Sequence, residues 1–145
     1  MPNDPKFANG QQWNLYHYGQ DGGVPGADIG APAAWDIINS VPDVIVAIID
    51  TGVCTTHEDI VDNLWTNPDT SSPFVHGINT AVDPPTGNVE DDFGHGASVA
   101  GVVGARGNNG KGVTGVSWQV KLMICKWMNG NIKVKPNRLW LHLAK

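Results

Sequence analysis

Two short apolar runs and a stretch of small residues dominate the hydrophobic pattern of the chain. Residues 44–49 form a continuous apolar run rich in β-branched residues, and residues 120–127, which are mostly apolar, are predicted as a second buried strand. Continuous rather than alternating hydrophobicity predicts strands buried on both faces, as in a parallel sheet. Between them, residues 97–105 are rich in alanine, valine and glycine, which predicts a helix that packs closely against another element. The order strand, helix, strand predicts an α/β fold.

Polar, turn-rich stretches separate these elements. Residues 1–30 are rich in Gly, Pro, Asn and Gln and predict an extended N-terminal arm. A short helix is predicted at 31–38, where Pro32 occupies the first turn at no hydrogen-bonding cost. Residues 66–94 predict a long loop, and loops of this length inside a compact domain usually carry function.

Composition excludes several classes of protein. The chain has 145 residues, of which 41% are hydrophobic, enough for a packed core. No apolar run approaches the roughly 18 residues of a membrane span, and the first residues lack the apolar region of a signal peptide. The net charge of −5 argues against nucleic-acid binding. Two cysteines, Cys54 and Cys125, are too few for a disulfide framework.

Charge is unevenly distributed along the chain. All 14 acidic residues lie between Asp4 and Asp92, whereas six of the nine basic residues lie in the last 25 positions. A basic C-terminal segment is typical of an interaction tail, or of a stretch that does not belong with the rest.

Asp50 and His95 suit acid–base chemistry. Asp50 ends the first apolar run, and functional groups collect at the carboxyl ends of strands in open parallel sheets. His95 stands between two glycines at the start of the predicted helix. An Asp that holds an imidazole in one tautomer allows it to act as a base. Each residue alone is equally consistent with a turn cap or an ordinary solvated imidazole.

The segments around both residues resemble those of subtilisin-like serine proteases, the subtilases. The likeness covers roughly residues 3–128 in the family's order. It is carried by the N-terminal arm (Asn3-Asp4-Pro5 and Gln12-Trp13), the first helix (31–35), the aspartate motif (46–53 and 57–60), the histidine motif (91–101) and the loop after it (108–116). Ala97 and Ser98 depart from the motif, which usually has Thr and His there.

The resemblance implies a three-layer α/β subtilisin-like fold of which this chain holds the N-terminal half. It also implies proteolysis through an Asp–His–Ser triad, with Asp50 orienting the histidine and His95 as general base and acid. The serine follows the histidine in this family, and no Gly-Thr-Ser-x-Ala motif follows His95. Ser98 lies only three residues after His95, so it turns with the helix instead of facing the imidazole. We therefore expect no activity from this chain alone.

The same comparison divides the chain into an arm (1–30), half of a catalytic domain (31–128) and a divergent basic tail (129–145). Pro136 interrupts the helix that the family would form in the tail. A frameshifted, mis-spliced or truncated product has this form. The family implies secretion, and a polypeptide substrate once the missing half is supplied.

A calcium site is also implied by the resemblance, between the arm and the loops after the aspartate strand and the histidine helix. The expected ligands are the side chains of Asp4, Gln12, Asp59 and Asn109 and the carbonyls of Gly107, Lys111 and Val113. Hard oxygen ligands from loops suit Ca²⁺. Asp59 and Asn109 are equally consistent with ordinary turn residues. No organic cofactor is expected.

Three alternatives remain at this point. Ile48-Ile49-Asp50-Thr51-Gly52, with Val102-Val103-Gly104, resembles a retroviral-type aspartic protease, which needs two aspartates and an all-β chain. Cys54 and His57 have a zinc-ligand spacing, but structural zinc sites usually pair two such motifs. The third alternative is a non-catalytic subtilase fragment or pseudoprotease.

Overall fold

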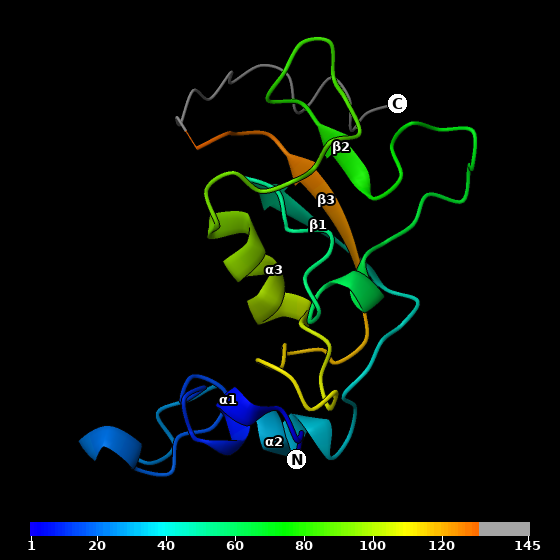
Figure 1. The fold of residues 1–145 in the computed structure, drawn as a ribbon. Coiled ribbons are helices and arrows are strands. Elements are labelled where there is room, and N and C mark those ends of the chain that lie inside the picture. The colour runs from blue at the N-terminus through cyan, green and yellow to red at the C-terminus, as the bar shows by residue number, and fades with distance from the viewer. Residues whose placement is uncertain (131–145) are drawn as a thin grey trace.

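The computed structural model of the chain describes residues 1–130; residues 131–145, with Pro136 and most of the predicted tail at 129–145, lie outside the described residues. The elements in chain order are α1 (Pro5–Ala8), a 3₁₀ turn (Gln20–Gly22), α2 (Ala31–Trp35), β1 (Ile45–Asp50), a second 3₁₀ turn (Val61–Asn63), β2 (Gly77–Asn79), α3 (His95–Gly104) and β3 (Lys121–Lys126). Figure 1 shows the three strands and α3 at one end of the molecule and α1 and α2 at the other.

The three strands form one parallel sheet in the order β1-β3-β2, which confirms the predicted α/β class. Asp50 at the end of β1 and Asn79 at the end of β2 are both in register with Lys126 at the end of β3. Because the strands are parallel and end together, their last side chains meet at one edge of the sheet.

Helix α3 packs on one face of this sheet (Figure 1). Two of its glycines explain the close approach: a Cβ on Gly104 would overlap the Val120 side chain, and one on Gly96 would overlap the backbone of Gly52. The core between helix and sheet consists of Ile48, Val53, Ile60, Val89, Ala100, Val120, Leu122 and Ile124.

The prediction that the first strand is buried on both faces is wrong for β1. Ile48 and Asp50 face α3 and are buried, whereas Ile45 and Ile49 point the other way and are about half exposed, at 50% and 43%. Within residues 1–130, α3 covers one face of β1, so the alternate side chains of an apolar run remain open to solvent.

The N-terminal arm is not extended throughout, contrary to the prediction for residues 1–30. Pro5 begins a single helical turn, α1, and the Lys6 N–H donates to the Gly112 carbonyl at 2.9 Å. A second apolar cluster holds the arm against α2, with Trp118 packed on it: Phe7, Leu15, Ala31 and Trp35. The ring of Trp35 lies edge-on to those of Phe7 and Trp118, with both centroid distances at 5.4 Å.

Three boundaries differ from the sequence-based expectations. Strand β2 lies inside the predicted loop 66–94. It was not predicted because three residues are too few to show a periodic hydrophobic pattern. Helix α2 ends at Trp35 instead of residue 38. Helix α3 begins at His95, two residues before the predicted start at 97, and the N–H of Gly96 in its first turn is satisfied by the hydroxyl of Thr51.

Candidate active site

Asp50 and His95 are in direct contact at the carboxyl edge of the sheet. The His95 Nδ1 atom lies 2.8 Å from both carboxylate oxygens of Asp50. The Thr51 N–H also donates to Asp50 Oδ1, at 2.7 Å. The carboxylate is therefore held on two sides and accepts the Nδ1–H, which leaves Nε2 of the ring as the basic nitrogen.

The local backbone explains how His95 reaches Asp50. Gly94 precedes the helix with φ +91°, a left-handed conformation that favours glycine, and turns the chain into α3. Gly96 allows the first turn of the helix to lie against Gly52, directly after β1. The imidazole is 60% exposed and the Asp50 side chain is 10% exposed. The carboxylate is therefore enclosed by protein, while the histidine ring is accessible from solvent.

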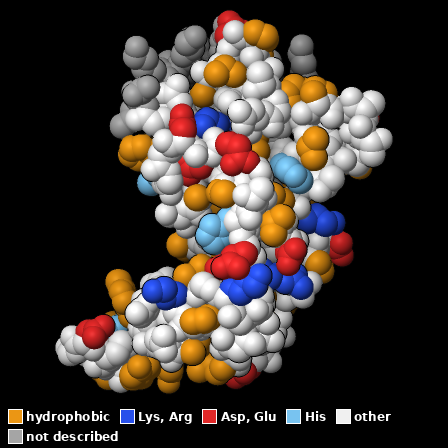
Figure 2. Space-filling model, in the orientation of Figure 1, with side chains coloured by type: hydrophobic (Ala, Val, Ile, Leu, Met, Phe, Trp, Pro, Cys, Tyr) orange, Lys and Arg blue, Asp and Glu red, His pale blue; other side chains and the backbone are white. Residues whose placement is uncertain are grey.

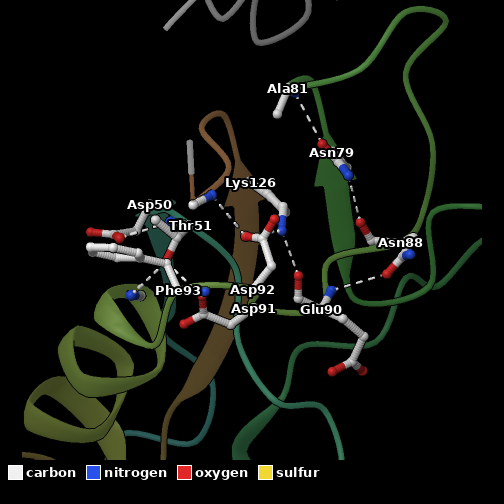
Figure 3. A network of polar contacts seen from close by, with 12 residues as sticks. Asp50, Thr51, Asn79, Ala81, Asn88, Glu90, Asp91, Asp92, Phe93 and Lys126 are labelled. Atoms are coloured by element: carbon white, nitrogen blue, oxygen red, sulfur yellow. Dashed lines mark hydrogen bonds and ion pairs between the residues drawn. The ribbon is translucent and has the colours of Figure 1, made fainter. Parts of the chain in front are cut away.

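A network of polar contacts fixes the segment that precedes α3 (Figure 3). The buried Lys126 ammonium donates to the Glu90 carbonyl at 2.6 Å and to Asp92 at 2.9 Å. The hydrogen bond from Lys126 holds the pKa of the Asp92 carboxyl below its usual range. The Asn79 amide donates to the Asn88 carbonyl at 2.8 Å. Strands β2 and β3 thereby hold the segment from which His95 emerges.

Sequence reasoning missed Thr51, Asp91 and Lys126, which support the pair without touching the ring. The Asp91 carboxylate accepts the Thr51 hydroxyl at 2.8 Å and the Ala97 N–H at 2.8 Å. The signal for Asp91 was present, because an Asp shortly before a helix is a capping residue. No local signal marks Lys126, whose partners lie 34 and 36 residues away.

Ser98 makes no contact of the kind a nucleophile needs. Its hydroxyl donates to the carbonyl of Gly94 at 2.9 Å, one turn back in the same helix.

The predicted calcium ligands fall into two groups. Asp4 and Asp59, both buried, meet at the loop after α3: Asp4 accepts the Asn108 N–H at 2.7 Å, and Asp59 accepts the Asn109 side-chain amide at 3.0 Å. The Gln12 side chain forms the second group and is hydrogen-bonded to the backbone of Thr114. Its amide nitrogen donates to the Thr114 carbonyl at 2.8 Å, and its amide oxygen accepts the Thr114 N–H at 2.9 Å.

The rival chemistries fit the structure poorly. Val102-Val103-Gly104 lies in α3, whereas an aspartic protease needs that element in a β-strand. Cys125 is buried in β3 and the Cys54 sulfur contacts the Thr56 hydroxyl, so the two thiols do not share a site. Among residues 1–130, no three His, Cys, Asp or Glu side chains are placed to hold a metal.

The visible surface is electrically mixed. Figure 2 shows basic side chains beside acidic ones instead of a continuous basic patch on this face. Two exposed ion pairs are Lys111–Glu58 at 3.3 Å and Lys121–Asp43 at 3.6 Å. No helix within the described part of the chain has the length and apolar character needed to cross a bilayer.

The parallel sheet and the helix packed on it define an α/β protein in which an aspartate at a strand end is hydrogen-bonded to a histidine at a helix start. A sequence model of the Subtilase family matches residues 42–136, which include both residues. The chain therefore belongs to the subtilase family.

Curated relatives are consistent with this membership. The chain is 33% identical over 128 residues to the cell wall-associated protease of Bacillus subtilis, a match of 87% of this chain and 13% of that protein. It is 33% identical over 123 residues to human neuroendocrine convertase 2, covering 83% of this chain and 18% of the convertase. The chain thus spans less than a fifth of the length of these two relatives.

A solved structure shares the fold. The chain superposes on a protease of Pseudoalteromonas arctica with a TM-score of 0.61 and 25% identity, over 85% of this chain and 38% of that one.

Proposed function

We propose that this chain supplies the Asp–His part of a serine endopeptidase site. Asp50 orients the histidine, and His95 is the general base and acid. The observation that carries the proposal is the 2.8 Å distance from His95 Nδ1 to both Asp50 oxygens. An imidazole fixed this way presents Nε2 to a hydroxyl nucleophile, takes its proton during acyl transfer, and is stabilised as imidazolium by the carboxylate.

Neither the Asp50 segment nor the His95 segment supplies a nucleophile. No Gly-Thr-Ser-x-Ala motif follows His95 in the 145 residues, and Ser98 bonds to its own helix. In subtilisin, removing the nucleophile lowers kcat by about 10⁶. We therefore infer that the 145-residue chain does not hydrolyse peptide bonds by itself, and that its substrate is a polypeptide once a serine-bearing segment completes the site.

The first experiment tests the chain alone. The purified 145-residue chain is incubated with a chromogenic peptide and, separately, with a fluorophosphonate probe, which labels only an activated serine. We expect neither turnover nor labelling. Turnover by the chain that is abolished in Asp50→Ala or His95→Ala would contradict the inference.

A chimera tests the acid–base roles directly. The segment of the Bacillus subtilis protease that aligns with this chain is replaced by this chain's residues, so that the serine comes from the host. We expect peptide hydrolysis that falls by about 10⁴ in Asp50→Asn, because the wrong imidazole tautomer is then favoured. The control Asp62→Asn changes an exposed carboxylate outside the site and should leave the rate unchanged. A folded but inactive chimera would instead favour a non-catalytic pseudoprotease.

We also propose that Asp4, Asp59 and Asn109 hold a structural Ca²⁺, with backbone carbonyls of residues 107–113 as further ligands. Two observations support the fit: both carboxylates are buried, at 0% and 2% exposure, and neither forms an ion pair with a basic side chain within residues 1–130. Buried carboxylates need a cation or several N–H donors, and oxygen ligands on loops suit Ca²⁺. Gln12 is a fourth candidate ligand. The amides of Gln12 and Asn109 accept the N–H groups of Thr114 and Lys111, and both carboxylates accept N–H groups of the loop at 108–113, so the ion would replace some of these hydrogen bonds.

Thermal unfolding with Ca²⁺ or with a chelator tests this site without any activity. At 100 times its Kd, the ion adds about 2.7 kcal/mol, or about 8 °C at roughly 3 °C per kcal/mol for a chain of this size. Asp59→Asn should abolish the shift and Asp62→Asn should retain it. Identical melting temperatures with and without the ion would exclude the site.

An extracellular location is the last part of the proposal. It is supported by the relative in Bacillus subtilis, whose name places it at the cell wall. Fractionation of the source cells, with an antibody against this chain, tests it: recovery only from the cell interior would contradict it.

A further inference from the structure

Two side chains outside the Asp–His pair join the strand that carries Asp50 to the helix that carries His95. Thr51 follows Asp50 directly and is 3% exposed. Its N–H donates to Asp50 Oδ1 at 2.7 Å, and its hydroxyl donates to Asp91 Oδ1 at 2.8 Å. The same hydroxyl oxygen accepts the N–H of Gly96 at 2.9 Å. Thr51 therefore contacts the carboxylate of the pair and the helix of the histidine at once.

Asp91 completes this connection from the other side. Its Oδ1 accepts the N–H groups of Phe93 and Gly94, each at 2.9 Å, and its Oδ2 accepts the N–H of Ala97 at 2.8 Å. Burial alone would raise the pKa of this carboxyl, but its backbone hydrogen bonds outweigh burial and hold the pKa below its usual range. Asp91 is consequently an anion at neutral pH.

The N-cap position of α3 carries no side chain that could cap the helix, so the contacts of Thr51 and Asp91 take that role. The residue before His95 is Gly94, which has no side chain to bond the first-turn N–H groups. Gly96 and Ala97 are instead satisfied by Thr51 and Asp91. The position of the first turn is therefore set jointly by the end of β1, through Thr51, and by the preceding segment, through Asp91.

The anchoring segment is itself held in place. Its residues pair with the chain after β1, through the Val53 N–H to the Val89 carbonyl at 2.9 Å and the Asp91 N–H to the Val53 carbonyl at 3.0 Å. Lys126 holds the neighbouring Glu90 carbonyl at 2.6 Å. Figure 3 shows Thr51 and Asp91 pointing toward one another between β1 and the start of α3.

We propose that Thr51 and Asp91 are positioning residues that hold the His95 ring against Asp50. They act through the first turn of α3 and touch no reacting atom. The proposal rests on the proposed function for its catalytic meaning, but the contact it explains exists in this chain without a serine. A merely structural helix cap would stabilise α3 and leave the His95–Asp50 contact unchanged when removed.

The test uses NMR of the full 145-residue chain with ¹⁵N-labelled histidine. The His95 Nδ1–H proton, when hydrogen-bonded to Asp50, should give a downfield resonance, and that hydrogen bond should slow its exchange with water. Thr51→Val removes the hydroxyl, and with it the contacts of Thr51 to Asp91 and to the Gly96 N–H. Asp91 keeps its three backbone N–H partners, so most of the capping of α3 remains. Thr51→Ser restores the hydroxyl. Ser98→Ala is the matched control, because Ser98 bonds only within α3.

We expect Thr51→Val to raise the exchange rate of the Nδ1–H by about tenfold or more, the factor for losing one hydrogen bond to a charged acceptor. Asp91→Asn should act in the same direction. Thr51→Ser and Ser98→Ala should keep the resonance and its exchange rate. A Thr51→Val chain that melts lower but retains the wild-type resonance and exchange rate would overturn the proposal, since Thr51 would then only cap the helix.

A measurement on the unmutated chain decides the matter if Thr51→Val does not fold. Exchange of the Gly96 amide and of the His95 Nδ1–H is followed at rising, sub-denaturing urea. If the first turn holds the ring, both rates rise in parallel. A ring proton whose rate stays constant while the Gly96 rate rises would overturn the proposal. Neither measurement uses hydrolysis, so its outcome is separate from that of the chimera.

Discussion

Two glycines of α3 predict opposite responses to the same substitution. Gly96 faces the sheet: a Cβ there would overlap the Gly52 carbonyl oxygen and lie 2.9 Å from the Gly52 nitrogen and 3.1 Å from Asp50 Cβ. Gly101 faces away, and a Cβ there meets nothing within 4 Å. Neither has a positive φ, so alanine suits both backbones and only packing distinguishes them.

The magnitudes follow from this difference. Gly101→Ala should stabilise by about 0.5–1 kcal/mol, because alanine loses less backbone freedom in a helix. Gly96→Ala should destabilise by about 1–3 kcal/mol, because the overlap is with backbone that cannot rotate away. The variants should differ by about 1.5–4 kcal/mol, or about 5–12 °C in Tm at roughly 3 °C per kcal/mol.

Thermal unfolding followed by circular dichroism measures both variants under one condition. The His95 Nδ1–H resonance adds a local readout, since Gly96→Ala pushes α3 away from Asp50 and should weaken it, whereas Gly101→Ala should not. Equal melting temperatures for the two variants would refute the reasoning, because the helix would then not lie against Gly52 as described.

Further predictions concern groups away from the ring. Cys125, whose thiol pKa is raised by burial, should resist alkylation until the chain unfolds, whereas the partly exposed Cys54 should react in the folded state. Mass spectrometry after a short exposure to an alkylating reagent shows which thiol has been modified. The depressed pKa of Asp91 means that its contribution to stability is fully present above the usual Asp range and is lost as pH falls through the lower pKa of the folded state. Urea unfolding of Asp91→Asn should therefore show a deficit at pH 7 that shrinks below about pH 4, and a pH-independent deficit would contradict this. Lys126→Met should cost about 1–3 kcal/mol in urea unfolding, because the Glu90 carbonyl and the Asp92 carboxylate both lose a buried, charged donor. Lys121→Met, at an exposed ion pair, should cost less than about 1 kcal/mol, and equal costs would argue against a buried role for Lys126.

Local sequence predicted the α/β class and the identities of Asp50 and His95. Continuous apolar runs favour buried parallel strands, and the small residues of 97–105 predict a helix that lies close to its neighbour. These signals depend only on residues close together in the chain, so they can be recognised in a single sequence without any knowledge of the fold. The likeness to subtilases pointed to the same two residues, and the 2.8 Å contact between them agrees with it.

The supporting contacts were decided only by the tertiary structure. Thr51 and Asp91 lie 40 residues apart in the chain, and Lys126 lies 36 residues from Glu90, so no local pattern pairs them. Strand β2 was missed because its three residues are stabilised by pairing with β3 and not by their own propensity. The apolar run of β1 indicated two buried faces, but burial depends on what packs against each face, and α3 covers one of them in the described part of the chain. Sequence determined which groups can do chemistry, whereas parallel pairing, by ending three strands at one edge, determined which groups meet.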